Sequence, residues 1–286
     1  MKISVSSYSF SQYIRAGKMT QLDCVKKAHE LGITGIDYID IDGATQQDRL
    51  DNAKLIRAEA EKYGIEIVAY TIGANLFTGN AESDDAEMKK LIDKLDVAEA
   101  LGASLMRHDM TSALTGKGDG RSFDLMIPTL AERARRVTEI AASKGIRTCT
   151  ENHGFISQDA ERIERLYNAI NHENFGLLID IGNFACVDDD SVKAVSRLAP
   201  YAFHIHAKDF HKRTFEQGPA EGYFETRGCN YLAGCAIGEG DIPVAQCMAI
   251  IKKAGYDGWV TIEYEGGNDC IEGIARGRDY LEKVIG

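Results

Sequence analysis

Apolar residues recur along the chain in two alternating patterns, a helical spacing followed by a short strand-like run. Leu22, Val25 and Ala28 have the spacing of one helix face. Gly32 then separates this predicted helix from the apolar run at 33–39. Glycine adopts the left-handed conformation that ends many helices, so the chain can turn back toward a sheet. The same succession of helix, glycine and strand recurs around Gly64, Gly102, Gly145 and Gly255.

This repetition predicts eight strands, each with a helical segment after it. The strands are expected at about 3–9, 33–39, 65–72, 103–108, 146–151, 175–181, 201–207 and 258–264. The helices are expected at about 20–32, 46–64, 83–101, 123–144, 158–172, 188–199, 243–254 and 269–284. Strict alternation requires right-handed crossovers between parallel strands. Eight such units predict a single-domain α/β fold, a closed (β/α)₈ TIM barrel spanning residues 1–286.

An open, doubly wound sheet is the alternative architecture. Such sheets normally carry a GxGxxG turn after the first strand, and Ser9-Phe10-Ser11-Gln12 contains nothing like it. One connection of the predicted barrel is long, at about 210–241, and it is rich in glycine and aromatic residues. Because it follows the seventh strand, we expect it to cover the C-terminal face, where barrel active sites lie. A second loop, from His108 to Arg121, leaves the fourth strand at the same face.

Four of the predicted strands end in a side chain that can bind a metal. These residues are Glu151, Asp180, His206 and Glu263, at the ends of the fifth to eighth strands. Consecutive strands of a barrel bring such ends together at one side of the mouth. One imidazole and three carboxylates form an oxygen-rich set that suits Mn²⁺ or Mg²⁺ and tolerates Co²⁺ or Zn²⁺. We therefore predict one divalent metal ion held by these four residues.

The predicted seventh strand alternates polar and apolar residues. As a strand it places His204, His206 and Lys208 on one face, and Phe203 with its apolar neighbours on the other. Lys208 is expected either to bind a substrate oxygen or to pair with Asp209. His204 is expected to be a buried histidine that supports the metal ligand above it.

Four motifs together resemble the xylose isomerase-like TIM-barrel superfamily, which includes sugar isomerases, ketose 3-epimerases, inosose and dehydroshikimate dehydratases, and endonuclease IV. The resemblance covers the whole chain and implies that the matching Glu, Asp, His and Glu bind one divalent cation. Many members carry a histidine three residues after the aspartate, where this chain has Asn183, which argues against a multinuclear zinc site. The motifs are Thr150-Glu151-Asn152-His153, Asp180-Ile181-Gly182-Asn183, His204-Ile205-His206-Ala207-Lys208-Asp209 and Ile262-Glu263.

The resemblance leaves more than one mechanism open. Glu151 and Glu263, flanking a substrate, would exchange a proton between its two faces and give 3-epimerisation. His153 resembles the general base of the family's dehydratases and would give elimination instead. His108 and Arg227, together with Lys208, are further candidates for binding substrate. Glu265, Glu239 and Asp241 are expected to be solvated or to cap loops.

The sequence favours a divalent-metal-dependent keto-sugar isomerase or epimerase. It would remove a proton next to a carbonyl through a metal-stabilised enediolate. Two alternatives stay open at this point. One is a metal-dependent lyase or dehydratase acting on a keto-polyol or 3-keto glycoside with His153 as base, and the other is a non-catalytic sugar-binding barrel.

The amino-acid composition argues against some classes of binding partner. The formal net charge of −11 argues against nucleic acid, because phosphate binding needs a basic face. No apolar run approaches the roughly 18 residues of a membrane helix, and the first residues are too polar for a signal peptide. The seven cysteines include no CxxC pair and are expected to be reduced thiols of a cytoplasmic protein. The expected partner is a small-molecule sugar, and the sequence leaves open whether the chain forms an oligomer.

Overall fold

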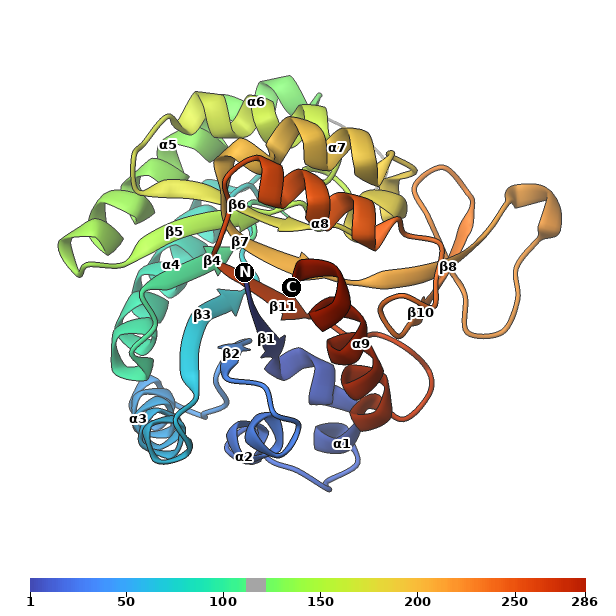
Figure 1. Cartoon of the computed structure of the whole chain (residues 1–286). Coiled ribbons are helices and arrows are strands. Elements are labelled where there is room, and N and C mark those ends of the chain that lie inside the picture. The colour runs from blue at the N-terminus through green and yellow to red at the C-terminus, as the bar shows by residue number, and fades with distance from the viewer. Residues whose placement is uncertain (112–121) are drawn as a thin grey trace.

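The computed structural model describes residues 1–111 and 122–286, and its centre is a closed barrel of parallel strands (Figure 1). The predicted (β/α)₈ fold is confirmed, with neighbours in the order β1-β11-β7-β6-β5-β4-β3-β2. Residues 112–121 of the predicted loop from His108 to Arg121 lie outside the described residues. The barrel strands are β1 (Lys2–Ser6), β2 (Gly35–Tyr38), β3 (Glu66–Ile72), β4 (Leu105–His108), β5 (Arg147–Glu151), β6 (Phe175–Asp180), β7 (Ala202–Ala207) and β11 (Trp259–Ile262).

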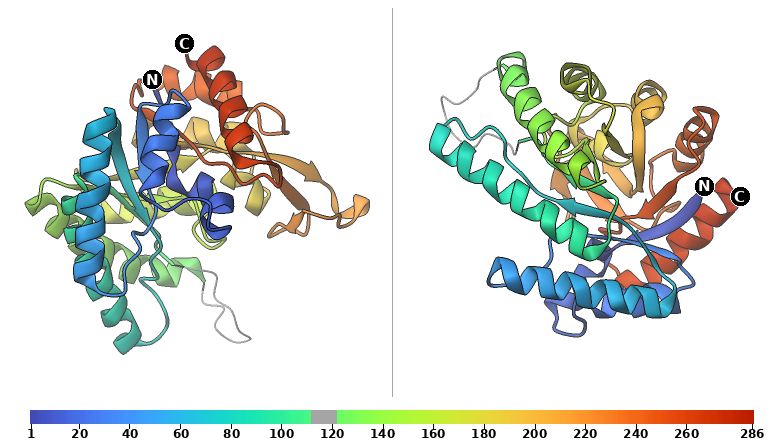
Figure 2. Two further views of the ribbon diagram at one scale, coloured as in Figure 1. Left: turned by 90° about the horizontal axis from the view of Figure 1, so that it is seen from below. Right: turned by 90° about the vertical axis from the view of Figure 1, so that its left-hand side faces the viewer.

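Helices surround the barrel on its outside, as both views of Figure 2 show. Several end at a left-handed glycine where the sequence predicted one, for example Gly64 after α3 and Gly102 after α4. No helix in the described part of the chain has the length and apolar character that crossing a membrane requires. The helices are α1 (Ser11–Arg15), α2 (Asp23–Glu30), α3 (Gln46–Tyr63), α4 (Ala81–Leu101), α5 (Phe123–Ser143), α6 (Ala160–Ile170), α7 (Ser191–Leu198), α8 (Val244–Lys253) and α9 (Cys270–Ile285), with short 3₁₀ turns η1 (Ser7–Phe10), η2 (Asn183–Val187) and η3 (Ala199–Tyr201).

The interior of the barrel has an apolar half and a polar half. Strands β3 to β6 contribute an apolar cluster of Ala69, Leu105, Cys149 and Leu178. On the other side, Thr261 Oγ1 lies 2.6 Å from Ser4 Oγ and 2.8 Å from His204 Nε2. Polar groups buried this deeply are stable only when they are paired. The barrel therefore carries a hydrogen-bonded column directly beneath His206.

The predicted direction of Phe203 is wrong. Instead of facing the helices, its ring packs against the apolar cluster inside the barrel. The register between β6 and β7 shifts after Leu177, which pairs with Ala202, whereas Leu178 pairs with His204. Phe203 is thus an extra residue in a bulge, and bulges turn side chains from the alternating pattern. Gly176 makes the room, because a Cβ there would lie 2.3 Å from the Phe203 ring.

The long connection after β7 is folded into a small antiparallel sheet. Strands β8 (Asp209–Arg213), β10 (Tyr231–Cys235) and β9 (Phe224–Glu225) pair in that order, with η4 (Phe215–Gln217) between them. This insertion projects sideways from the barrel (Figure 1). Its base is fixed by Asp209, whose carboxylate accepts hydrogen bonds from the backbone N–H groups of Phe210, Gly238, Gly240 and Ile242.

Candidate active site

The four predicted metal ligands converge at one side of the barrel mouth. Glu151, Asp180 and His206 end or nearly end β5, β6 and β7, and Glu263 directly follows β11. Each offers a ligand atom, and these atoms all lie within 4.8 Å of one another. Asp180 and His206 are partners in the register of β6 and β7, which places their side chains next to each other. We call these four residues the metal quartet.

Two atoms of the metal quartet indicate that it fits a cation. His206 Nδ1 and Asp180 Oδ2 are buried and have no hydrogen-bond partner among the described residues. Their charged neighbours are Lys208 Nζ, 3.4 Å from Asp180 Oδ2, and Glu263 Oε1, 3.7 Å from His206 Nδ1. A buried polar atom that lacks a hydrogen bond costs about 1–3 kcal/mol. Both atoms belong to the donor set that a hard or borderline divalent ion prefers. The residues present therefore fit a bound divalent metal ion.

Asp180 is held rigidly by its surroundings. Its Oδ1 accepts hydrogen bonds from the backbone N–H groups of Gly182 at 2.8 Å and Asn183 at 3.0 Å. Asn152 donates to the Asp180 carbonyl and accepts from its N–H, both at 2.9 Å. Only Oδ2 is left for a ligand. Burial raises the pKa of Asp180 to about 7; Glu263 and Glu151 add to this rise, and Lys208 opposes it.

Glu151 is engaged at both oxygens. Oε2 lies 2.5 Å from Arg107 Nη2, and Oε1 accepts a hydrogen bond of 2.8 Å from Asn183 Nδ2. Arg107 is itself buried, on the neighbouring strand β4. Asn183, where many relatives were expected to carry a histidine, therefore contacts the metal quartet as a hydrogen-bond donor.

His153 lies beside the metal quartet without belonging to it. Its Nδ1 is 3.2 Å from both carboxylate oxygens of Asp109, and 48% of its side chain is exposed. Asp109 also pairs with Arg107 at 3.0 Å. Desolvation disfavours the charged imidazole, but the Asp109 carboxylate outweighs it and raises the pKa of His153. The geometry agrees with the predicted position of His153, while its catalytic role stays a prediction.

Lys208 lies among carboxylates at the centre of the site. Its Nζ is 2.6 Å from Glu263 Oε2, 3.2 Å from Glu265 Oε1 and 3.4 Å from Asp180 Oδ2. Burial opposes the charged ammonium, but Asp180 and Glu263 outweigh it and raise the pKa of Lys208. Pairing of Lys208 with Asp209 was the wrong alternative, since Asp209 binds backbone groups. The expectation that Glu265 is merely solvated or loop-capping is also wrong, because Glu265 contacts Lys208.

Two candidate substrate-binding residues lie away from the metal quartet. His108 is fully buried, with its ring against Phe175 at a centroid distance of 6.4 Å. Arg227 donates from Nη1 to the Phe155 carbonyl at 3.0 Å and pairs with Asp159 at 2.9 Å. The structure does not bring either residue to the quartet. A substrate-binding role for each stays a prediction.

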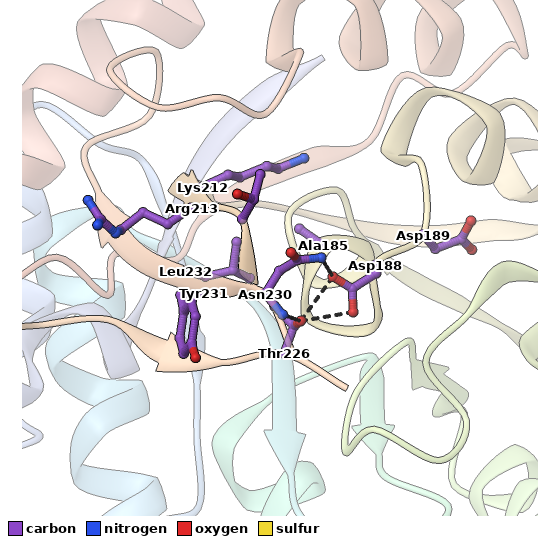
Figure 3. Close-up of a pocket in the computed structure, with 10 residues that line it drawn as sticks. Ala185, Asp188, Asp189, Lys212, Arg213, Thr226, Asn230, Tyr231 and Leu232 are labelled. Carbon is purple, nitrogen blue, oxygen red and sulfur yellow. Dashed lines mark hydrogen bonds between the residues drawn. The ribbon is translucent and has the colours of Figure 1, made fainter. Parts of the chain in front are cut away.

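The insertion is fastened to the barrel next to this site. Asp188, at the end of η2, accepts hydrogen bonds from the Thr226 hydroxyl, the Gly228 N–H and the Asn230 amide. Figure 3 shows Asp188 hydrogen-bonded to Thr226 and Asn230. The three residues line a cavity of about 270 Å³. The short turn η2 begins at Asn183, which donates a hydrogen bond to Glu151, and it ends next to Asp188. The turn therefore connects the insertion to the metal quartet.

Replacing Asp188 by asparagine is expected to loosen the insertion and to raise KM. Asparagine tolerates the left-handed conformation of this residue, whose φ is 59°, but it cannot accept all of these hydrogen bonds. We expect a loss of about 1 kcal/mol, or a factor of about 5 in KM, with a smaller change in kcat. Glu216→Ala, on exposed η4, is the matched control. Steady-state kinetics identical to wild type for Asp188→Asn would count against a lid role for the insertion.

The family model described as xylose isomerase-like TIM barrel matches residues 25–284, so the chain belongs to this family. An inosose dehydratase of Clostridium perfringens (strain 13 / Type A) is 22% identical over 223 residues, which cover 75% of this chain and 74% of that protein. A structure of D-psicose 3-epimerase in the presence of D-fructose has a TM-score of 0.75 at 16% identity and covers 100% of both chains. The IOLI protein with a binding zinc atom has a TM-score of 0.77 at 14% identity, covering 100% of this chain and 98% of that one. The two structures establish likeness of fold, and function has to be argued from the site.

Proposed function

We propose that this protein is a divalent-metal-dependent lyase that dehydrates a keto-polyol of the inosose type. His153 would be the general base that takes a proton from the carbon next to the carbonyl. The observation that carries the proposal is the pairing of His153 with Asp109 beside the metal quartet. The name of the Clostridium perfringens relative supports the same class of reaction.

The His153–Asp109 pair has the arrangement that a base needs. Asp109 fixes the ring through Nδ1, while Nε2 has no hydrogen-bond partner among the described residues. A carboxylate on one imidazole nitrogen orients the ring and stabilises the positive charge that forms when the other nitrogen accepts a proton. Partial exposure at the mouth lets a substrate reach this nitrogen.

The two glutamates are less available for proton transfer. Glu151 already accepts from Arg107 and Asn183, one on each oxygen. Glu263 is paired with Lys208 at 2.6 Å. A carboxylate whose oxygens are occupied by cationic or amide donors must break those contacts before it can take a proton from carbon. This favours His153 over the two glutamates as the base.

The proposed elimination needs no proton donor or acceptor other than His153. His153 takes the proton from the carbon next to the carbonyl, the bond from the neighbouring carbon to its hydroxyl breaks, and a carbon–carbon double bond forms. The same proton leaves with the hydroxyl as water, so the protonation of the protein is restored. A divalent ion held by Glu151, Asp180, His206 and Glu263 would polarise the carbonyl and stabilise the negative charge that develops on its oxygen. Lys208, held among three carboxylates, would supply a further positive charge near the substrate oxygens.

The isomerase or 3-epimerase predicted from the sequence is the second candidate. It is favoured by the convergence of Glu151 and Glu263 in one cluster, with ligand atoms within 4.8 Å. In that mechanism the two carboxylates would exchange a proton between opposite faces of the substrate, and His153 would only orient it.

The two candidates predict different products. With Mn²⁺ or Mg²⁺ present, we expect an inosose to lose water and give a conjugated ketone, followed by its ultraviolet absorption and by ¹H NMR in D₂O. Ketohexoses such as D-psicose and D-fructose should not interconvert. Interconversion of these sugars with deuterium incorporation, without any conjugated product from the inosose, would overturn the lyase in favour of the epimerase.

A further inference from the structure

A buried carboxylate outside the metal quartet contacts one of its ligands from below. Asp37 lies on β2, is fully buried, and has its Oδ2 2.8 Å from His206 Nε2. Strand β2 is not a neighbour of β7 in the barrel, so this contact crosses the barrel interior. We infer that Asp37 is a positioning residue that fixes His206 so that its Nδ1 binds the metal. The inference rests on the metal site of the proposed function.

The two nitrogens of the His206 ring have different surroundings. Nε2 meets the Asp37 carboxylate, whereas Nδ1 is buried without a hydrogen-bond partner in the described part of the chain. Nδ1 faces the metal quartet, 3.7 Å from Glu263 Oε1. A carboxylate is an acceptor only, so it requires the proton on Nε2 and leaves the lone pair on Nδ1. Metal-binding histidines are commonly oriented by such a partner on the other nitrogen.

Asp37 is itself held by the polar column inside the barrel. His204 Nε2 lies 3.7 Å from the same Asp37 oxygen and 2.8 Å from Thr261 Oγ1, and Thr261 contacts Ser4. The rings of His204 and His206 meet edge to face at 5.5 Å. A buried carboxylate is costly unless it is paired. Both histidines contact Oδ2 of Asp37, whereas its Oδ1 is buried without a hydrogen-bond partner among the described residues. The column therefore supports the orientation of His206 from two sides.

Asp37, His204 and His206 could also be read as a second group of metal ligands, because their ligand atoms lie within 4.8 Å of one another. The 2.8 Å contact between Asp37 and His206 is instead the length of a charge-assisted hydrogen bond. The positioning role therefore predicts one metal ion in each chain, whereas a second site predicts two.

The test uses zinc as a diamagnetic probe on the full chain. Asp37→Asn is expected to weaken zinc binding by about 10–100-fold in a chelator competition, the usual effect of removing such a partner. Thr261→Val is the matched control, since it disturbs the same column without touching the contact between Asp37 and His206. Its zinc affinity should fall less than that of Asp37→Asn, because the contact between Asp37 and His206 remains, and thermal unfolding of the metal-free proteins checks that each variant folds.

A second measurement needs no variant. In the zinc-loaded wild-type protein, ¹⁵N NMR should show His206 metallated at Nδ1 and protonated at Nε2. Metallation at Nε2, two zinc ions in each chain, or an unchanged affinity in Asp37→Asn would overturn the positioning role while leaving the metal quartet intact. A wild-type protein that binds no zinc, Mn²⁺ or Mg²⁺ would overturn the metal site of the proposed function, and this inference with it.

Discussion

Replacing Asp180 by asparagine is expected to remove the bound metal and nearly all turnover. Asparagine keeps the size of the side chain and an Oδ1 that can accept from Gly182 and Asn183, so the local backbone should survive. It replaces Oδ2, the buried atom without a hydrogen-bond partner in the described chain, by an amide that cannot bind a cation. Loss of a Lewis acid costs several kcal/mol of transition-state stabilisation, so kcat/KM should fall by on the order of 10³-fold or more.

The measurement is metal content by elemental analysis together with steady-state kinetics. Asp189→Asn is the matched control, because Asp189 lies beyond η2 and its carboxylate accepts a hydrogen bond from the backbone N–H of Ala160, away from the metal quartet. It should keep metal and activity. Full metal occupancy in Asp180→Asn would remove Asp180 from the metal site.

Replacing His153 by alanine is expected to lower kcat by about 10²–10⁴-fold, the usual cost of losing a general base. The metal should remain, because His153 is not among the four residues whose ligand atoms converge. This separation of activity from metal content distinguishes a base from a ligand. His29→Ala, on the outer helix α2, is the control for loss of a histidine and should behave as wild type. A decrease of about 10-fold or less in His153→Ala would instead fit a residue that only orients substrate.

Much of the site could be predicted because strand ends follow simple geometry. Alternation along each strand gives the inward face, and consecutive parallel strands bring their ends together. This reasoning located Glu151, Asp180, His206 and Glu263 without knowledge of any contact. It failed at Phe203, because a single extra residue in β7 reverses the expected direction and leaves no mark in the composition of the strand.

The partners of the metal quartet could not be predicted in the same way. Arg107 and Asp109 contact the site from β4 and the residue after it, and Asp37 reaches it across the barrel. Each contact depends on the register of strands that are distant in sequence, which alternation alone does not determine. Arg107 lies two residues after Leu105 on β4, so alternation along the strand could have predicted that both side chains face the barrel interior. Glu265 was missed because its contact with Lys208 depends on the path of the chain after β11.

The structure of the insertion could be predicted from the sequence only in part. Its glycine and aromatic residues predicted a functional loop, but residues 209–235 contain the paired strands β8, β9 and β10. Glycine in β10 and the two-residue length of β9 weaken the alternating pattern that identifies strands. We still propose that this insertion covers the substrate, and the Asp188→Asn variant tests this proposal.

In the proposed reaction, His153 takes the carbon-bound proton of the substrate. The most direct test of this step is solvent deuterium exchange into unreacted inosose, followed by ¹H NMR, with metal-loaded wild-type protein and metal-loaded His153→Ala. Wild-type protein should exchange the proton next to the carbonyl, and the variant, with full metal content, should lose this exchange. Near-wild-type exchange in His153→Ala would show that His153 is not the base and would leave Glu151 and Glu263 as the proton-transfer pair.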